Sequence, residues 1–416
     1  MTTPMTNPLL VSHRLPPFSQ IQAEHVEPAV DALIEESRTH LTKLLAELKH
    51  VSWQSLVEPL ESQADKLNQA WSPVSHLNSV VNSDELREAY NNSIVKLTAF
   101  STEMSQNAEL YGAYETLANS DEYTGLSIAQ QKTIDNALRD FRLAGVALSD
   151  DKKQRYGEIK KRLSELQTQF SNNVLDATQA WYKQIETKHV GALAGLPEGA
   201  LAQAAEAAKL KSLEGYVITL DIPSYLAVMT YADDRALRQE MYRAYVSRAS
   251  KEGQLAAGSD LDAGKWDNSP LIEEILALRH EQSLLLDFNN YAELSLASKM
   301  AEDADQVESF LTELAESSVS VAHKDMAELA KYAKQTQNLD AIEAWDIAYF
   351  SEKLREEKYS VSQEELKPYF PSGRVVEGLF QVVNELYGIA VEEDVEVEKW
   401  HDDVQFFNIS RHGKPI

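Results

Sequence analysis

Apolar residues recur at steps of three and four along most of the chain, which is the spacing of one face of an α-helix. The first such stretch begins near Ala23, and its apolar face comprises Val30, Leu33, Ile34, Leu41, Leu44, Leu45 and Leu48. Pro28 falls in its early turns, where a helix tolerates proline. The same periodicity predicts further helices at residues 52–82, 84–107, 109–118, 197–209, 242–250, 270–287, 289–298, 303–335 and 375–387.

Two more helices are indicated by their first residues. Ser127 follows the turn signal at Gly125 and is a typical N-cap. A long helix begins at Ser149, because acidic residues follow there at what would be its positive end. The chain is therefore predicted to be mainly α.

Short β-branched and aromatic runs interrupt the helices. Residues 181–188 and 216–222 flank a predicted helix, and we expect them to pair as a small sheet. Near the C-terminus, residues 404–410 read as a strand, and Arg411–Lys414 predicts a hairpin turn. No return strand is expected after this turn. The pattern therefore predicts an unpaired sheet edge and a chain that ends inside a folding unit.

The length of 416 residues favours roughly two or three domain-sized regions. We expect an extended, proline-rich arm over residues 1–20 and a helical region over 21–148. A second helical region is predicted over 149–388, with a small β element near 181–222. Residues 389–416 are expected to begin a further, catalytic region, and the polar, turn-rich stretch Gly258–Pro270 predicts a loop.

Composition narrows the possible partners. Thirty-nine Lys and Arg against 66 Asp and Glu give a net charge of −27, which repels phosphate backbones and anionic lipid, so we expect no nucleic-acid and no membrane partner. The absence of cysteine excludes disulfides, thiolate metal sites and cysteine nucleophiles. The N-terminus does not read as a signal peptide, and no apolar stretch is long enough to span a bilayer. A cytoplasmic protein is expected.

The histidines form no zinc motif. Zinc hydrolases often carry two histidines four apart on a helix, with a glutamate between them as base. The nearest match is His280-Glu281, but Leu284 occupies the second ligand position, so we expect His280 to be a structural helix residue. His25 near a helix start is expected to pack or cap. His401, beside Asp402 and Asp403, favours a solvated turn over a cation site.

Other catalytic signatures are also missing. Residues 258–265 have the wrong spacing for a phosphate loop, and Trp266 stands where Ser or Thr is needed. The chain contains no G-x-S-x-G and no G-x-G-x-x-G sequence. The acidic run 392–398 alternates with valine, which favours an exposed strand over a calcium site. The aromatic residues of Trp345–Phe350 recur at helical spacing, which favours a place in the hydrophobic core over a ligand-binding surface. The residues by themselves assign no catalytic, cofactor-binding or metal-ligating position.

Several sequence blocks nevertheless match the pattern of a known family. They occur in the same order and extend over almost the whole chain. They are HVEPAV (25–30), RDFRLAGVAL (139–148), LSELQTQFSNNVLDATQAW (163–181), the segments 215–250, 271–301 and 345–380, and WHDDVQFFNIS (400–410). In this arrangement the chain resembles the thimet oligopeptidase family of zinc metallopeptidases. The resemblance implies a mainly α, large multi-helix, zincin-like oligopeptidase fold with a few short β-strands, whose two lobes flank a narrow channel for short peptides.

The same resemblance also limits what this chain can do. In the family, an H-E-x-x-H helix supplies two zinc ligands and the general base, a downstream glutamate completes the metal site, and the activated water attacks the peptide carbonyl. That helix lies C-terminal to the strand matched here by residues 400–407. No catalytic or metal residue can therefore be carried over, and the C-terminal catalytic part is expected to be missing.

We therefore expect the N-terminal portion of a cytosolic zinc-dependent oligopeptidase that hydrolyses short peptides. Zinc is the cofactor of the family, but none is expected to bind this chain, which is predicted to be inactive alone. Expected partners are short peptides and the missing C-terminal part of the enzyme. Surfaces around residues 404–409 and 345–350 are expected to be exposed and apolar. The alternatives are a stand-alone helical peptide-binding or interaction protein, and one half of a split peptidase.

Overall fold

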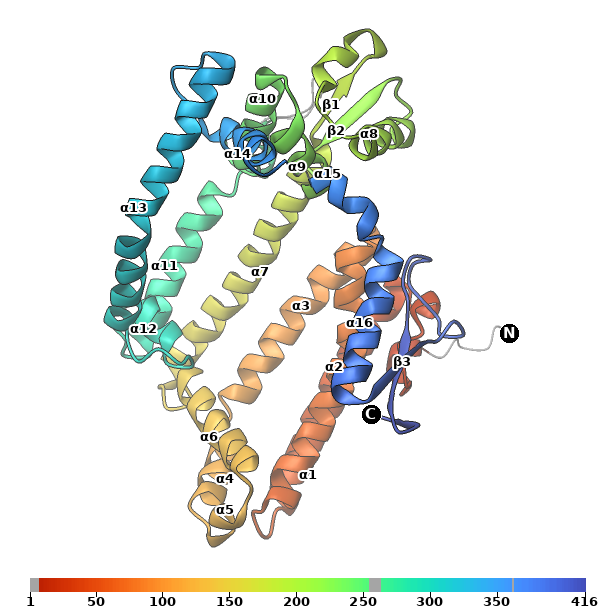
Figure 1. The fold of residues 1–416 in the computed structure, drawn as a ribbon. Coiled ribbons are helices and arrows are strands. Elements are labelled where there is room, and N and C mark those ends of the chain that lie inside the picture. Colours follow the sequence, from red (N-terminus) through yellow and green to blue (C-terminus); the bar gives the residue numbers. More distant parts are fainter. Residues whose placement is uncertain (1–6, 254–262, 361–362) are drawn as a thin grey trace. The chain divides into compact units, whose positions relative to one another are not determined.

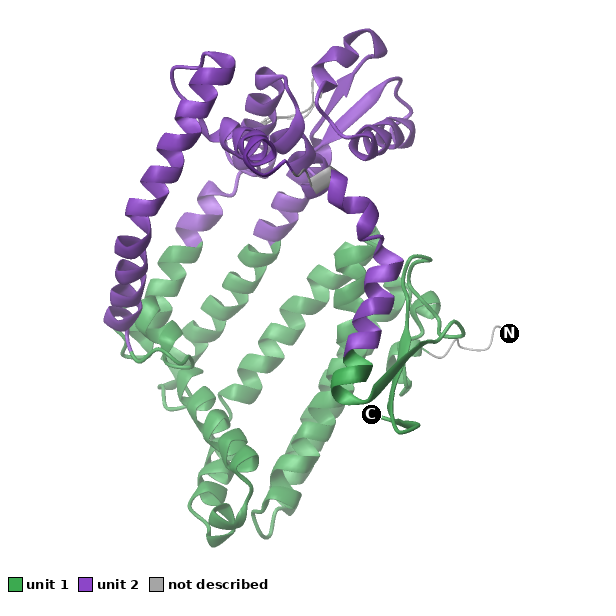
Figure 2. Cartoon of the chain, viewed as in Figure 1, with its two compact units in different colours: residues 1–168, 275–302, 383–416 green, residues 169–274, 303–382 purple. Residues whose placement is uncertain are grey.

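The computed structural model describes residues 7–253, 263–360 and 363–416 (Figure 1). They form two compact units, each assembled from separated segments (Figure 2). Unit 1 comprises residues 1–168, 275–302 and 383–416, and unit 2 comprises residues 169–274 and 303–382. The four consecutive regions expected from the sequence stay a prediction. The mainly α fold with a few short strands is confirmed.

Unit 1 is built on long amphipathic helices. After the 3₁₀ turns Pro8–Leu10 and Phe18–Gln20 come α1 (Ala23–Glu47), a π turn (Trp53–Val57), α2 (Glu58–Val80), α3 (Asp84–Ser105), α4 (Ala108–Ala118), α5 (Asp121–Gly125), α6 (Ile128–Leu143) and the start of α7 (Asp150–Ala180). Most of α11 (Ser269–Leu285) and all of α12 (Tyr291–Leu296) also belong here. Val30, Leu33 and Ile34 of the predicted apolar stripe are buried where α1 packs against α2 and α3, which run beside it (Figure 1). Leu41 packs instead with the π turn, α4 and α6, and the rest of the stripe is only partly buried.

Unit 2 combines a two-stranded sheet with helices. Its elements are β1 (Tyr182–Ile185), a 3₁₀ segment (Thr187–Leu193), α8 (Glu198–Leu210), β2 (Tyr216–Thr219), α9 (Ile222–Tyr231), α10 (Arg235–Val246), a 3₁₀ turn (Ala263–Trp266), α13 (Ala304–Gln337), α14 (Ala344–Tyr359), α15 (Gln363–Leu366), a 3₁₀ turn (Lys367–Tyr369) and most of α16 (Ser372–Tyr387). The small sheet expected from the sequence is confirmed, with β1 antiparallel to β2.

The C-terminal segment corrects one prediction. β3 (Ile389–Glu393), β4 (Phe407–Arg411) and β5 (Lys414–Pro415) form a sheet in the order β3-β4-β5. The expectation that no strand returns after the turn was wrong. His412 and Gly413 both have positive φ, 51° and 73°, which is the backbone of a tight two-residue hairpin. β5 has only two residues and is too short to carry an alternating pattern, so it could not be predicted from periodicity.

Two further expectations need correction. Residues 345–350 are not an exposed apolar surface, because Tyr349 and Phe350 are buried against Leu329 and Ala333. Ile409, in the other expected surface, is 45% exposed. The predicted loop 258–270 lies partly outside the described residues. Within them it is shorter than expected, since residues 263–266 form a 3₁₀ turn and α11 already begins at Ser269. No helix in the described part of the chain is both long and apolar enough to cross a membrane.

Candidate functional site

A protein zinc site needs three or four His, Cys, Asp or Glu side chains close together. Among residues 7–253, 263–360 and 363–416, no group of three or more His, Cys, Asp or Glu side chains is placed to hold a metal ion. The sequence itself contains no His-Glu-x-x-His. The residues present therefore do not fit the zinc site that the resemblance implies, and no step of chemistry is derived through a metal here.

The nearest sequence match to a zinc helix has a structural role. His280 is exposed on α11, and Glu281 accepts two hydrogen bonds from Arg155 on α7, at 2.6 and 2.7 Å. The hydrogen bond from Arg155 holds the pKa of Glu281 below its usual value. A carboxylate held in this way by a guanidinium is a poor general base, since its proton affinity is reduced. Glu281 joins two helices of unit 1.

The other two histidines considered from the sequence are also accounted for. Nδ1 of the buried His25 accepts a hydrogen bond from the backbone N–H of Gln22 at 3.1 Å, so His25 caps the start of α1 and packs there, as predicted. His401 is exposed in a turn, where its Nδ1 accepts a hydrogen bond from the backbone N–H of Asp403 at 3.2 Å. This is the solvated turn that the sequence favoured.

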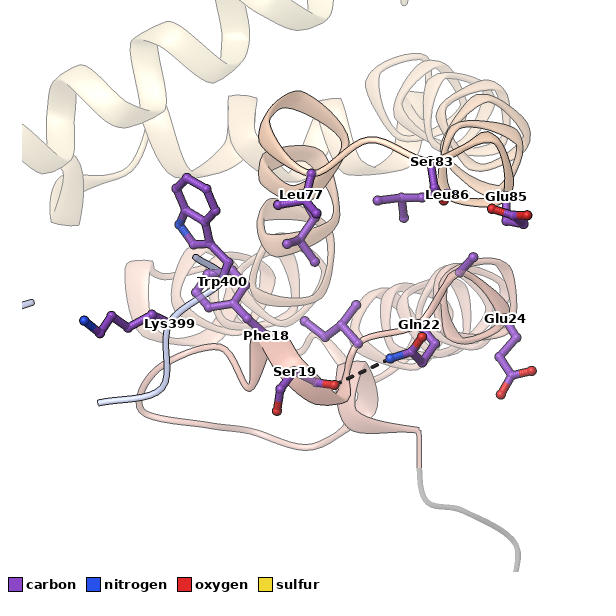
Figure 3. Close-up of a pocket in the computed structure, with 13 residues that line it drawn as sticks. Phe18, Ser19, Gln22, Glu24, Leu77, Ser83, Glu85, Leu86, Lys399 and Trp400 are labelled. Atoms are coloured by element: carbon purple, nitrogen blue, oxygen red, sulfur yellow. Dashed lines mark hydrogen bonds between the residues drawn. The ribbon is translucent and has the colours of Figure 1, made fainter. Parts of the chain in front are cut away.

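A pocket of about 840 Å³ lies where the segment before β4 meets the N-terminal helices of unit 1 (Figure 3). Its apolar walls come from the turn Phe18–Gln20, the end of α2 and the start of α3, and Trp400 closes one side. The Trp400 ring meets the edge of His76 with ring centroids 5.1 Å apart, and Phe18 lies 5.9 Å from the same imidazole. The carboxylate of Glu398 accepts a hydrogen bond from the backbone N–H of Ser19.

Acidic, basic and hydroxyl side chains all line this pocket. Glu24, Glu85 and Lys399 line it, together with the hydroxyls of Ser19 and Ser83. The hydrogen bond from its own backbone N–H, and then the one from Ser83, lower the pKa of Glu85, so it stays ionised at the start of α3. No histidine lines the pocket to activate a serine. We interpret the pocket as the place where residues 398–400 pack on the N-terminal helices.

Unit 2 holds a buried polar cluster that reasoning from the sequence missed. Asp346 on α14 accepts hydrogen bonds from Arg235 and Arg238 on α10. A signal was present, because Arg238 is flanked by Leu237 and Met241 on the apolar face of its helix, where an arginine needs a buried acidic partner. The sequence does not say which of 66 acidic residues provides it.

Comparison with known proteins places the chain in a family. Residues 30–153 match the N-terminal domain of neurolysin and thimet oligopeptidase, and residues 228–415 match peptidase family M3. The chain is 51% identical over 405 residues, 97% of its length, to oligopeptidase A of Escherichia coli (strain K12), the bacterial member that the quoted blocks resemble. The chain belongs to peptidase family M3, the thimet oligopeptidase family. The recognition made from the sequence blocks is thus confirmed.

Two plant proteins are similar over the same stretch. The probable cytosolic oligopeptidase A of Arabidopsis thaliana is 37% identical over 412 residues, covering 97% of this chain and 56% of its own length. The organellar oligopeptidase A of the same plant, described as chloroplastic and mitochondrial, is 37% identical over 422 residues, 99% of this chain and 51% of its own. The match to the Escherichia coli enzyme covers 58% of that relative. The chain thus spans between half and three fifths of the length of these relatives.

Proposed function

We propose that these 416 residues are the helical, non-catalytic part of an oligopeptidase A-type peptidase that hydrolyses short peptides with zinc. The observation that carries the proposal is the 51% identity over 97% of the chain, combined with a sequence that contains no His-Glu-x-x-His. The described residues add no alternative metal cluster. In this proposal the zinc ligands and the general base belong to the part of the relatives that this chain does not cover.

In this proposal the chain forms one side of the channel that binds peptides, and its shape and charge influence which peptides enter. The net charge of −27 repels acidic peptides at long range, so we propose a preference for neutral and basic peptides. We also propose that the chain acts in the cytosol, as the name of one plant relative states for that protein. Because a second plant relative is named for organelles, fractionation of the source cells is the direct test.

Peptide hydrolysis tests the main proposal. The purified chain is incubated with a fluorescence-quenched peptide, with added zinc and with a chelator. We expect no turnover and no stoichiometric zinc. A polypeptide covering the remaining part of the Escherichia coli relative is then added, and chelator-sensitive turnover is expected to appear. The control is the same polypeptide with the glutamate of its His-Glu-x-x-His changed to glutamine. Chelator-sensitive turnover by the chain alone would show that it holds its own metal site and that the proposal is wrong.

One alternative is favoured by a specific observation. Val375, Leu379, Val382 and Leu386 recur at steps of four, three and four along α16, and each is between 49% and 68% exposed. Such a stripe is typical of a helix that packs on another surface. A stand-alone interaction protein would use it to bind a partner. If the complementing polypeptide restores no turnover while the chain still captures peptides without cleaving them, that alternative is supported instead.

A further inference from the structure

A second cavity, of about 860 Å³, lies inside unit 1 among α1, α2, α3, α4, α6 and α7. Most of its lining is apolar and includes Leu60, Leu67, Trp71, Leu97, Phe100 and Phe141. Its size falls within the range of small-molecule sites, which are usually apolar with a few polar groups that orient the ligand. It is separate from the Trp400 pocket, with which it shares no lining residue.

The cavity contains a lysine without a counter-ion. Lys160 on α7 lines it, and burial lowers the pKa of its ammonium group. No hydrogen-bond or ion-pair partner of Lys160 is found within the part of the chain that the structure describes. Its neighbour Arg155, by contrast, pairs with Glu281. A half-buried ammonium that lacks an anion is costly, because burial removes hydration that nothing replaces.

A second polar side chain among the lining residues belongs to His40. Nε2 of His40 on α1 is buried and has no hydrogen-bond partner in the described residues. Two carboxylates also line the cavity, but both residues are exposed, and Asp140 pairs with Arg139. Burial, and then the charge of Glu61, raise the pKa of Tyr114 in the same wall to about 12, so its hydroxyl stays neutral. The cavity thus offers the ammonium of Lys160 to a ligand that carries a negative charge.

The backbone around the cavity argues against a peptide as the ligand. All of the lining residues except Ala144 lie in helices, whose N–H and C=O groups are already bonded to each other, and the carbonyl of Ala144 accepts a hydrogen bond from Gln106. The backbone of the lining residues therefore offers no partners to the amide groups of a peptide, and each buried amide group that also finds no side-chain partner costs about 1–3 kcal/mol. An alkyl chain has no such groups and gains free energy from burial against the apolar walls.

We propose that this cavity binds an apolar monocarboxylate of the fatty-acid type, with the carboxylate paired to the ammonium of Lys160 and the alkyl chain against the apolar helix faces. The carboxylate supplies the missing counter-ion, and the alkyl chain fills a space that the helices leave open. This site does not depend on the peptidase function.

The test measures binding to the full 416-residue chain with dansyl-labelled undecanoic acid as the fluorescent probe and dodecanoate as the competitor. We expect saturable binding that dodecanoate displaces, whereas dodecanol and dodecylamine displace at least about tenfold more weakly because they bring no negative charge. Lys160→Met keeps the length of the side chain without its charge and is expected to weaken binding by about tenfold or more. Lys161→Met removes the adjacent, exposed charge and is expected to leave binding within about twofold.

Thermal unfolding provides the second measurement. Dodecanoate is expected to raise the Tm of the unsubstituted chain and of Lys161→Met but not that of Lys160→Met. Circular dichroism of Lys160→Met checks that it folds, and if it does not, Lys160→Gln is the second variant, with the same loss of binding expected. The proposal is overturned if the probe shows no saturable binding, if dodecanol competes as well as dodecanoate, or if the folded Lys160→Met chain binds as tightly as the unsubstituted one.

Discussion

The guanidinium of Arg238 and the carboxylate of Asp346 lie 3.0 Å apart, and both side chains are fully buried. The pair joins α10 to α14 across 108 residues of sequence. The other two nitrogens of the Arg238 guanidinium also have partners, since Nη1 donates to the carbonyl of Ala232 and Nε to that of Trp345. The guanidinium lies 4.0 Å over the ring of Tyr349. Arg235 adds a second guanidinium to the same carboxylate at 2.7 Å.

We expect Asp346→Ala to destabilise unit 2 by about 3–5 kcal/mol, because it leaves the buried guanidinium of Arg238 without its anion. The measurement is urea-induced unfolding followed by circular dichroism. Asp340→Ala is the matched control: Asp340 also pairs with a cation, Lys334, but its side chain is 93% exposed, so a loss of at most about 1 kcal/mol is expected. Equal losses for the two variants would contradict the structural role of the buried pair.

The same carboxylate makes a specific contribution to the pH dependence of stability. Burial alone would raise the pKa of Asp346, but hydrogen bonds from Arg235, from the backbone of Glu343 and from Arg238 hold it below its ordinary value of 3.8. The unfolded chain therefore binds the proton more tightly than the folded chain does. The stabilisation is fully present above the unfolded pKa and is lost as the pH falls through the lower folded pKa.

We therefore expect the free energy of unfolding to fall more steeply below about pH 4 for the unsubstituted chain than for Asp346→Asn, which cannot titrate at this position. Urea titrations at several pH values between about 3 and 6 measure this difference. Comparing the two chains removes the contribution of the other carboxylates, such as Glu281, that the variant retains. Parallel pH profiles would show that Asp346 does not titrate differently in the folded and unfolded chains.

Gly215 is needed at the start of β2. Its φ is +87°, and a Cβ there would lie 2.4 Å from the carbonyl oxygen of Ile185 on the paired strand. We expect Gly215→Ala to destabilise unit 2 by about 1–3 kcal/mol. Gly199→Ala, in the first turn of α8, is the control, since an added Cβ meets nothing within 4 Å there and alanine favours the helix. Thermal unfolding is expected to show a lower Tm for the first variant and an unchanged or higher Tm for the second.

Trp400 is expected to hold the segment before β4 on the N-terminal helices. Trp400→Ala removes the ring that packs on His76, so the adjacent Lys399 becomes accessible more often. Limited trypsin digestion followed by mass spectrometry is expected to show cleavage after Lys399 several times faster than in the unsubstituted chain. Tyr387→Ala, which removes an aromatic ring that is already 62% exposed, should leave that rate unchanged. An unchanged rate for Trp400→Ala would show that the ring does not hold the segment.

The local elements were largely predictable because their signals are local. The apolar steps of three and four gave the long helices to within a few residues, as for α3 and α11, and Ser127 caps α6 by accepting a hydrogen bond from the backbone N–H of Gln130. α9 and α10 were exceptions, since no helix was predicted over Ile222–Tyr231, and α10 begins at Arg235 rather than near Tyr242. The first turn of α10 contains Arg235 and Arg238. Because arginine is usually exposed, this turn does not continue the apolar pattern, and only the structure shows that both arginines pair with the buried Asp346.

By itself, the sequence determined that the chain is mainly helical, that it carries no zinc-helix motif, and, through the order of its blocks, that it belongs to the M3 family. Only the tertiary structure decided that Asp346 is the partner of Arg238, that Trp400 packs on His76, and that Lys160 lines a cavity. The reason is physical. Helix periodicity depends on residues a few positions apart, whereas ion pairs and cavities depend on which distant helix faces meet.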